Sequence, residues 1–270
     1  AISATTTPKP LTSVSLDLRA LWRNSPIAVF AILMVGISNA SFGTLAAVYG
    51  ARIGLELSSI ALFASIPILA GALSQVPVGI ASDRYDRRVV LVVIASIAVI
   101  ADGLFLFGGF TTPGVVMTVA ALFGATVYAM YPVIVAHASD HAAPGTFIQV
   151  SGGLLLVFGI GSIIGPTVAG FAMSSYGETM LFAVTAAAHV GLVVFALIRL
   201  KYAPAVAAEK KGSFQATPMG RASTPETAAL AATEVITHAS RPSLMAGSST
   251  NQREPGRARI ATYGSLGSVA

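Results

Sequence analysis

Six apolar stretches, each about twenty residues or longer and almost free of charge, constrain this chain more than any other feature. They cover residues 26–49, 58–81, 89–108, 113–137, 148–172 and 179–200. A helix needs roughly 20 predominantly apolar residues to cross the hydrocarbon core of a bilayer. In lipid, every backbone polar group must also be satisfied within the protein. The sequence therefore predicts an all-helical integral membrane protein with six transmembrane helices, whose first partner is the lipid bilayer.

The composition agrees with this prediction and removes other classes of protein. Apolar residues make up 54% of the chain and charged residues only 10%, whereas a soluble domain carries about 25% charged residues. The chain has no cysteine, which excludes disulfides and cysteine chemistry. No cluster of ligand residues suggests a metal or another cofactor. The net charge of +5 comes from loops and a tail, so no nucleic-acid partner is expected.

The chain divides into three regions by composition. Residues 1–25 form a segment expected in the cytoplasm, with a short helix over 16–23 that carries Trp22 and lies in the membrane interface. Residues 26–202 form the transmembrane domain. Residues 203–270 are rich in Ser, Thr, Pro, Gly and Ala, which predicts a disordered cytoplasmic tail.

Two of the predicted helices have a clear start signal. Ser25 is followed by Pro26, and Thr112 is followed by Pro113. A hydroxyl is a good N-cap, and proline is favoured in the first helical turn because its missing N–H has no helical partner there. These pairs are predicted to cap and begin the first and fourth spans.

Lysine and arginine near the spans are distributed unequally between the two sides of the predicted bundle. Arg52 is on one side, and the residues on the other are Lys9, Arg19, Arg23, Arg84, Arg87, Arg88, Arg199, Lys201, Lys210 and Lys211. Basic residues favour cytoplasmic loops. The chain is therefore predicted to be a multi-pass protein of the inner or plasma membrane, with both termini in the cytoplasm.

The loop between the second and third spans is the densest charge cluster of the membrane domain. Residues 79–88 read GIASDRYDRR. This pattern, G-x-x-x-D-R-x-x-R-R, resembles the loop between the second and third helices of each half of a major facilitator superfamily transporter. The resemblance implies one six-helix half of a 6+6 bundle, built as a 3+3 inverted repeat. It also implies secondary active transport of a small-molecule substrate by alternating access, and no enzymatic activity.

The resemblance assigns roles to residues of this loop. Asp83 is expected to act as a conformational latch with Arg87 as its partner, and Gly79 to allow close helix approach. Arg84 and Arg88 are expected to face anionic headgroups. An alternative is a positively charged topology anchor with no switching role. Asp86 stands where the family often has glycine.

The fifth span contains a row of small residues followed by a proline. Gly161 and Gly165 lie on one helical face, which favours close packing of another helix. Pro166 frees a backbone carbonyl and permits a kink. The pattern resembles that of the corresponding family helix, although ordinary packing explains it equally well.

In the family, the first and fourth helices of each half line the central cavity. The resemblance therefore makes Asn39 and Ser41 cavity candidates on the first span. On the fourth span the candidates are Thr126, Tyr128 and Tyr131. Binding of substrate is one role for these polar groups, and hydrogen bonding between helices is the alternative.

Other ionisable residues have weaker assignments. Asp102 lies within the third span, where it is either proton-linked or a solvated or hydrogen-bonded aspartate near the outer interface. His137 and His141 flank Asp140 at the cytoplasmic end of the fourth span and are expected to be interfacial. His189 is expected to be a satisfied core histidine.

One half has only one wall of a cavity, so transport requires a further partner. This is a missing N-terminal half or a second copy, and the basic N-terminal segment favours the carboxyl-terminal half of a longer transporter. One alternative is a truncated or lone half that acts as a non-transporting membrane scaffold. Another is an intramembrane serine protease using Ser162 and His189, which is disfavoured because the chain has no G-x-S-x-G motif.

Overall fold

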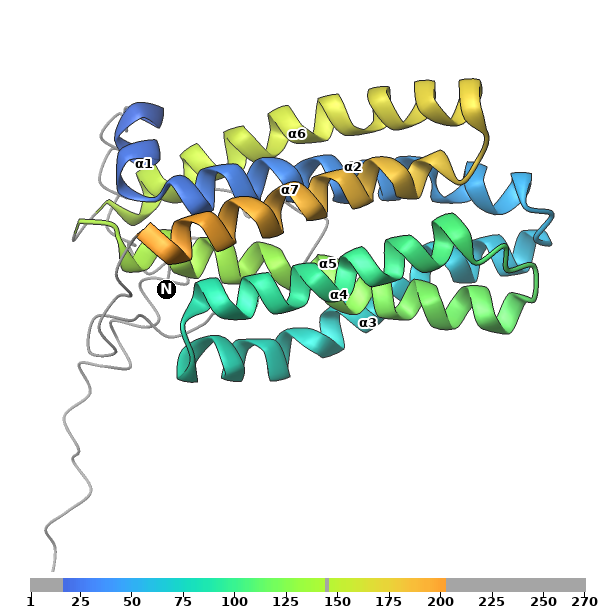
Figure 1. Cartoon of the computed structure of the whole chain (residues 1–270), viewed down its shortest axis with the longest axis horizontal. Coiled ribbons are helices and arrows are strands. Elements are labelled where there is room, and N and C mark those ends of the chain that lie inside the picture. Colours follow the sequence, from blue (N-terminus) through green and yellow to red (C-terminus); the bar gives the residue numbers. More distant parts are fainter. Residues whose placement is uncertain (1–16, 144–145, 203–270) are drawn as a thin grey trace, which may run out of the picture. The chain divides into compact units, whose positions relative to one another are not determined.

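The computed structural model describes residues 17–143 and 146–202, and its regular structure there is entirely α-helical (Figure 1). The helices are α1 Leu18–Asn24, α2 Pro26–Arg52, α3 Leu57–Arg84, α4 Arg87–Phe107, α5 Pro113–Asp140, α6 Phe147–Tyr176 and α7 Met180–Tyr202. In this part of the chain, α2 to α7 are long and apolar enough to cross a membrane. The predicted all-helical fold with six spanning helices is confirmed.

Helix ends follow the prediction to within about one helical turn. The predicted tail over 203–270 lies outside the described residues, as does most of the segment before α1. The three predicted regions therefore stay a prediction. The interfacial helix expected over 16–23 corresponds to α1, which begins after Asp17, whose carboxylate accepts a hydrogen bond of 2.8 Å from the backbone N–H of Ala20.

The starts of α2 and α5 lie at Pro26 and Pro113, as predicted. Ser25 and Thr112 occupy the N-cap positions, but neither side chain makes a capping hydrogen bond. The prediction that these two hydroxyls cap the helices is therefore wrong. Proline has a fixed φ that suits the first helical turn, so the start of the helix does not depend on the cap.

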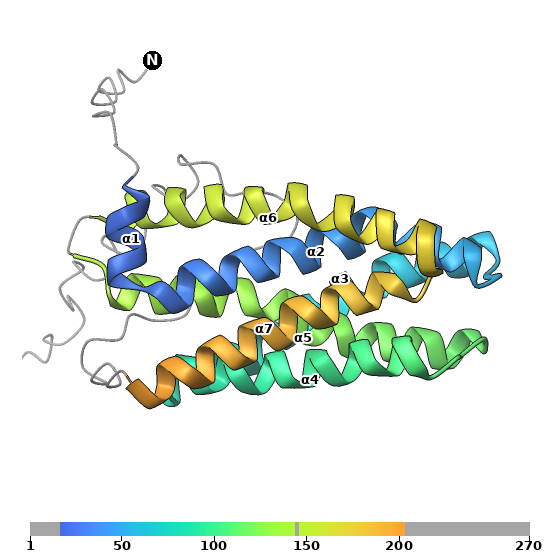
Figure 2. The same cartoon turned by 45° about the horizontal axis from the view of Figure 1, so that its top comes forward.

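The six spanning helices pack with the symmetry of an inverted repeat. The most extensive contacts join α2 to α6, α3 to α5, and α4 to α7. We match α2, α3 and α4 to α5, α6 and α7. The contact of α2 with α6 then corresponds to that of α5 with α3, and the contact of α4 with α7 corresponds to itself. Figures 1 and 2 show α2 to α7 lying lengthwise along the bundle, with successive helices running in opposite directions. This is the 3+3 arrangement expected for half of a twelve-helix bundle.

Glycines make the two largest helix contacts possible. A Cβ atom added at any of five glycines would approach the neighbouring helix more closely than real Cβ atoms do. They are Gly36, Gly161 and Gly165 between α2 and α6, and Gly71 and Gly124 between α3 and α5. Gly161 and Gly165 thus pack against α2 of the same bundle, and α6 continues without a break through Pro166.

One end of the bundle collects most of the charge. The turn between α3 and α4, the short helix α1, and the last turns of α5 and α7 lie together at this end (Figure 1). We call it the basic end, because Arg19, Arg23, Arg84, Arg87, Arg88, Arg199 and Lys201 lie on these segments. At the opposite end, Arg52 Nη1 donates a 2.7 Å hydrogen bond to the carbonyl of Met173 and so joins α2 to α6.

Candidate functional site

The charged turn at the basic end is held in shape by its own side chains. Asp86 is the N-cap of α4, and its carboxylate accepts the backbone N–H of Arg88 at 2.9 Å and Arg88 Nη2 at 2.7 Å. Burial alone would raise the pKa of Asp86, but the hydrogen bonds from Arg88 and its positive charge together lower that pKa. Arg88 is thus folded onto Asp86 and nearly buried, so its expected contact with headgroups is wrong. Arg84 is exposed.

Arg87 is the centre of the site, with only 1% of its side chain exposed. Its Nε lies 2.8 Å from Oδ2 of Asp140 at the end of α5. Its Nη2 lies 3.3 Å from Oδ1 of Asp83, and Nη1 donates to the hydroxyl of Ser82 at 3.3 Å. Arg87 therefore ties together α3, α4 and α5. Gly79, one turn before Asp83 on α3, is buried.

The two carboxylates around Arg87 are in different environments. The side chain of Asp140 is 3% exposed, whereas that of Asp83 is 41% exposed. The expected pairing of Asp83 with Arg87 is present, but the shorter and more buried contact is to Asp140. The guanidinium is therefore shared between a buried carboxylate inside this bundle and a more exposed one at its surface.

Asp140 is the residue of this site to which the sequence analysis gave no role. Its neighbours His137 and His141 have ring centroids 4.6 Å apart, and His141 Nδ1 lies 2.8 Å from the carbonyl oxygen of His137. His137 is buried, and the end of α5 packs against the charged turn through the contact of Asp140 with Arg87. The only sequence signal for Asp140 is an acidic residue at the end of an apolar helix, where an exposed position is the usual expectation.

Asn39 is the most distinctive of the cavity candidates. It lies halfway along α2, it is 8% exposed, and neither atom of its side-chain amide has a hydrogen-bond partner among the described residues. Ser41 donates instead to the carbonyl of Ile37 at 2.7 Å, and Thr126 to that of Phe123 at 2.8 Å. The hydroxyls of Ser41 and Thr126 are therefore satisfied by their own helices.

Both candidate tyrosines project from α5 toward neighbouring helices. Tyr128 is nearly buried and lies against Gly71 of α3. The ring of Tyr131 meets that of Phe158 on α6 edge-on, with the centroids 5.5 Å apart. Thr126 and the two tyrosines share α5, and Asn39 lies on α2, which also contacts α5.

The remaining polar candidates lie elsewhere in the bundle. Asp102 on α4 is fully buried and bonded to Thr185 and His189 of α7, so it is hydrogen-bonded and not solvated. Ser162 donates to the carbonyl of Phe158 at 2.9 Å. Ser162 and His189 thus have different hydrogen-bond partners, which removes the support for a serine protease dyad.

The fold defines a multi-pass helical membrane protein with a charged turn at one end of the bundle. The sequence model of the Major Facilitator Superfamily matches residues 6–252. The chain therefore belongs to the Major Facilitator Superfamily.

Named relatives agree with this assignment. An "Uncharacterized MFS-type transporter YcaD" of Salmonella arizonae is 27% identical over 171 residues, which is 63% of this chain and 43% of the relative. Another uncharacterized MFS-type transporter, from an Enterobacter species, is 28% identical over 160 residues, which is 59% of this chain and 41% of the relative. The chain thus matches less than half the length of these relatives.

Proposed function

We propose that this chain works as one half of a secondary active transporter that moves a small solute by alternating access, without covalent catalysis. Membership of a transporter superfamily and the names of the relatives support transport in general. The observation that carries the proposal is the buried Arg87, which joins the predicted latch loop to α5 in a 3+3 half-bundle. Alternating access rocks one such half against another around a site near the middle of the membrane.

A second six-helix bundle is the partner that this half requires. Among the spanning helices, α3 is the least buried and α6 the next. Their exposed apolar residues include Leu62, Leu69, Leu73 and Val76 on α3, and Ile163, Val168 and Phe171 on α6. The relatives are more than twice as long as the matched region, so the rest of a longer polypeptide, on its amino-terminal side, is the proposed occupant. A second copy of this chain is the other possible source of this bundle.

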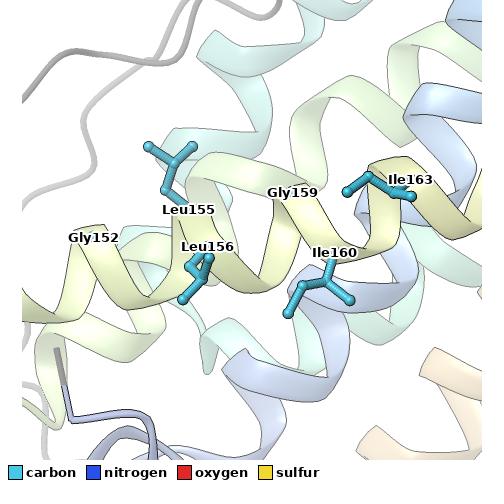
Figure 3. Close-up of a pocket in the computed structure, with 6 residues that line it drawn as sticks. All are labelled: Gly152, Leu155, Leu156, Gly159, Ile160 and Ile163. Atoms are coloured by element: carbon cyan, nitrogen blue, oxygen red, sulfur yellow. The ribbon is translucent and has the colours of Figure 1, made fainter.

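The outer face of α6 has a surface suited to this partner. A shallow apolar groove is lined by side chains of this one helix (Figure 3). Gly152 and Gly159 form its floor, and Leu155, Leu156, Ile160 and Ile163 surround them. A Cβ at Gly159 would meet no atom within 4 Å. Small residues on an open face of a membrane helix allow another helix to approach closely.

Within this half, we propose Asn39 on α2 as the central substrate contact, with Tyr128 and Tyr131 on α5, which packs against α2, as further contacts. A buried amide without a partner costs about 1–3 kcal/mol, and a hydrogen-bonding substrate would remove this cost. Ser41 and Thr126 are secondary candidates, because their hydroxyls are already engaged. A polar but uncharged contact set favours a substrate that is not strongly charged.

The loop is proposed to act as the latch, with Asp83 and Arg87 as the switching pair. Arg87 is fixed by the buried Asp140, while the exposed side of Asp83 faces away from this half. In the proposed orientation the basic end is cytoplasmic and both termini lie inside, because arginine and lysine favour that side. Arg84, which is exposed at the same end, faces the headgroups.

Thiol labelling tests alternating access without knowledge of the substrate. The chain has no cysteine, so Asn39→Cys introduces a single reporter into the chain. We expect a membrane-impermeant maleimide to label this cysteine in right-side-out and in inside-out vesicles, because the site opens to each side in turn. Tyr85→Cys, which lies in the exposed turn, is expected to be labelled from the cytoplasmic side only.

Ala98→Cys is the matched control, because Ala98 is fully buried on α4 and should react from neither side. Labelling of Asn39→Cys from one side alone, or from neither, would contradict alternating access and favour a scaffold. Labelling of Tyr85→Cys from outside would overturn the orientation only, so the two failures are distinguishable.

A further inference from the structure

The contact between α4 and α7 encloses three polar side chains that the proposed transport does not use. Asp102, Thr185 and His189 are each 0% exposed. Thr185 Oγ1 donates to Asp102 Oδ1 at 2.6 Å, and His189 Nδ1 lies 2.6 Å from Asp102 Oδ2. Both carboxyl oxygens of Asp102 on α4 thus contact polar side chains of α7.

Aromatic rings cover this cluster. One turn toward the end opposite the basic end, Phe105 and Phe182 are stacked with their centroids 4.0 Å apart. On the α5 side, the ring of Phe123 meets the imidazole of His189 in an edge-type contact, with the centroids 6.2 Å apart. Tyr49 of α2 packs edge-on against both Phe105 and Phe182. No charge from α2 or α5 is placed against the carboxyl by these contacts.

A net charge in such surroundings is costly, because desolvation of an unpaired ion costs several kcal/mol. An ionised Asp102 beside a neutral His189 would carry a net charge of −1. One added proton, on the carboxyl or on the imidazole, makes the pair neutral, and a second would make it positive. The neutral pair with one such proton is therefore the favoured state.

We infer that Asp102, Thr185 and His189 form a buried polar clamp of net charge zero, which joins the third helix of one repeat to the third helix of the other. The role of Asp102 is then to hold the half together. Thr185 fixes the carboxyl, and it also approaches the carbonyl of Phe182 on its own helix at 3.3 Å.

Thermal unfolding of the purified full chain tests the clamp. His189→Phe leaves the carboxyl without its imidazole partner, and the expected loss in Tm is roughly 10 °C. In Asp102→Asn, the amide oxygen can still accept a hydrogen bond from Thr185, and the amide nitrogen can donate one to His189. The Tm of this variant should therefore fall much less. The double variant Asp102→Leu/His189→Phe removes both groups, and Thr185 can turn to the carbonyl of Phe182. It should therefore recover at least half of the loss.

A double variant whose Tm is no higher than that of His189→Phe would overturn the clamp. If His189→Phe does not fold, the yield of monodisperse double variant replaces Tm as the readout, and failure of that variant too would overturn it.

Discussion

Replacing Gly165 with alanine is expected to destabilise the bundle by about 1–3 kcal/mol, although only one methyl group is added. The new Cβ would clash with the carbonyl oxygen of Ile37 and would lie 2.8 Å from the hydroxyl of Ser41. Because the obstruction is backbone of α2, the two helices must separate along their most extensive contact. Leucine at this position should prevent folding of the half itself. Thermal unfolding in detergent measures the effect.

Gly170→Ala is the matched control on the same helix. A Cβ there would meet no atom within 4 Å, and alanine is a better helix former than glycine by about 1 kcal/mol. Gly170→Ala should therefore be neutral or stabilising, so the two substitutions should have effects of opposite sign. Equal effects at Gly165 and Gly170 would show that the α2–α6 contact is not as close as described here.

Arg87→Ala should cost roughly 3 kcal/mol or more, since it leaves the buried carboxylate of Asp140 without its counter-charge. Arg87→Lys keeps the charge but loses the fork that reaches two helices at once, so we expect an intermediate loss. The measurement is again the unfolding midpoint of the purified protein. Removing both partners in Arg87→Ala/Asp140→Ala should recover part of the loss.

Arg84→Ala provides the control for charge at the same turn. Arg84 is exposed, so its removal should change stability by only about 0.5 kcal/mol. A loss as large as that of Arg87→Ala would mean that net charge at the basic end, and not the buried contact with Asp140, stabilises the turn.

The spans could be predicted from sequence because the length of an apolar helix is set by the thickness of the bilayer. Pro26 and Pro113 located two helix starts to the residue. The pairing of α2 with α6 was less accessible, since helices in lipid are apolar on all sides and carry little periodic signal. Gly161 and Gly165 pointed to a close contact, but their partner on α2 was visible only in the fold.

The polar contacts were harder to predict for a different reason. Arg87 and Asp140 lie 53 residues apart along the chain, and Asp102 and His189 lie 87 residues apart. Each residue was noticed alone, but no local pattern links the two members of either pair. Arg88 was expected to face lipid headgroups, because a local sequence does not reveal that the preceding Asp86 will bind it.

We propose that α3 and α6 face a second six-helix bundle in the membrane. Photocrosslinking from benzophenone side chains in place of Leu73 and Phe171, which are 68% and 69% exposed, tests it most directly. Ile100 on α4 and Leu197 on α7, also exposed, serve as lipid-facing controls. We expect Leu73 and Phe171 to crosslink to another six-helix segment, in the same longer polypeptide or in a second chain, and the controls to crosslink to lipid. Lipid crosslinks alone at all four positions would contradict the claim.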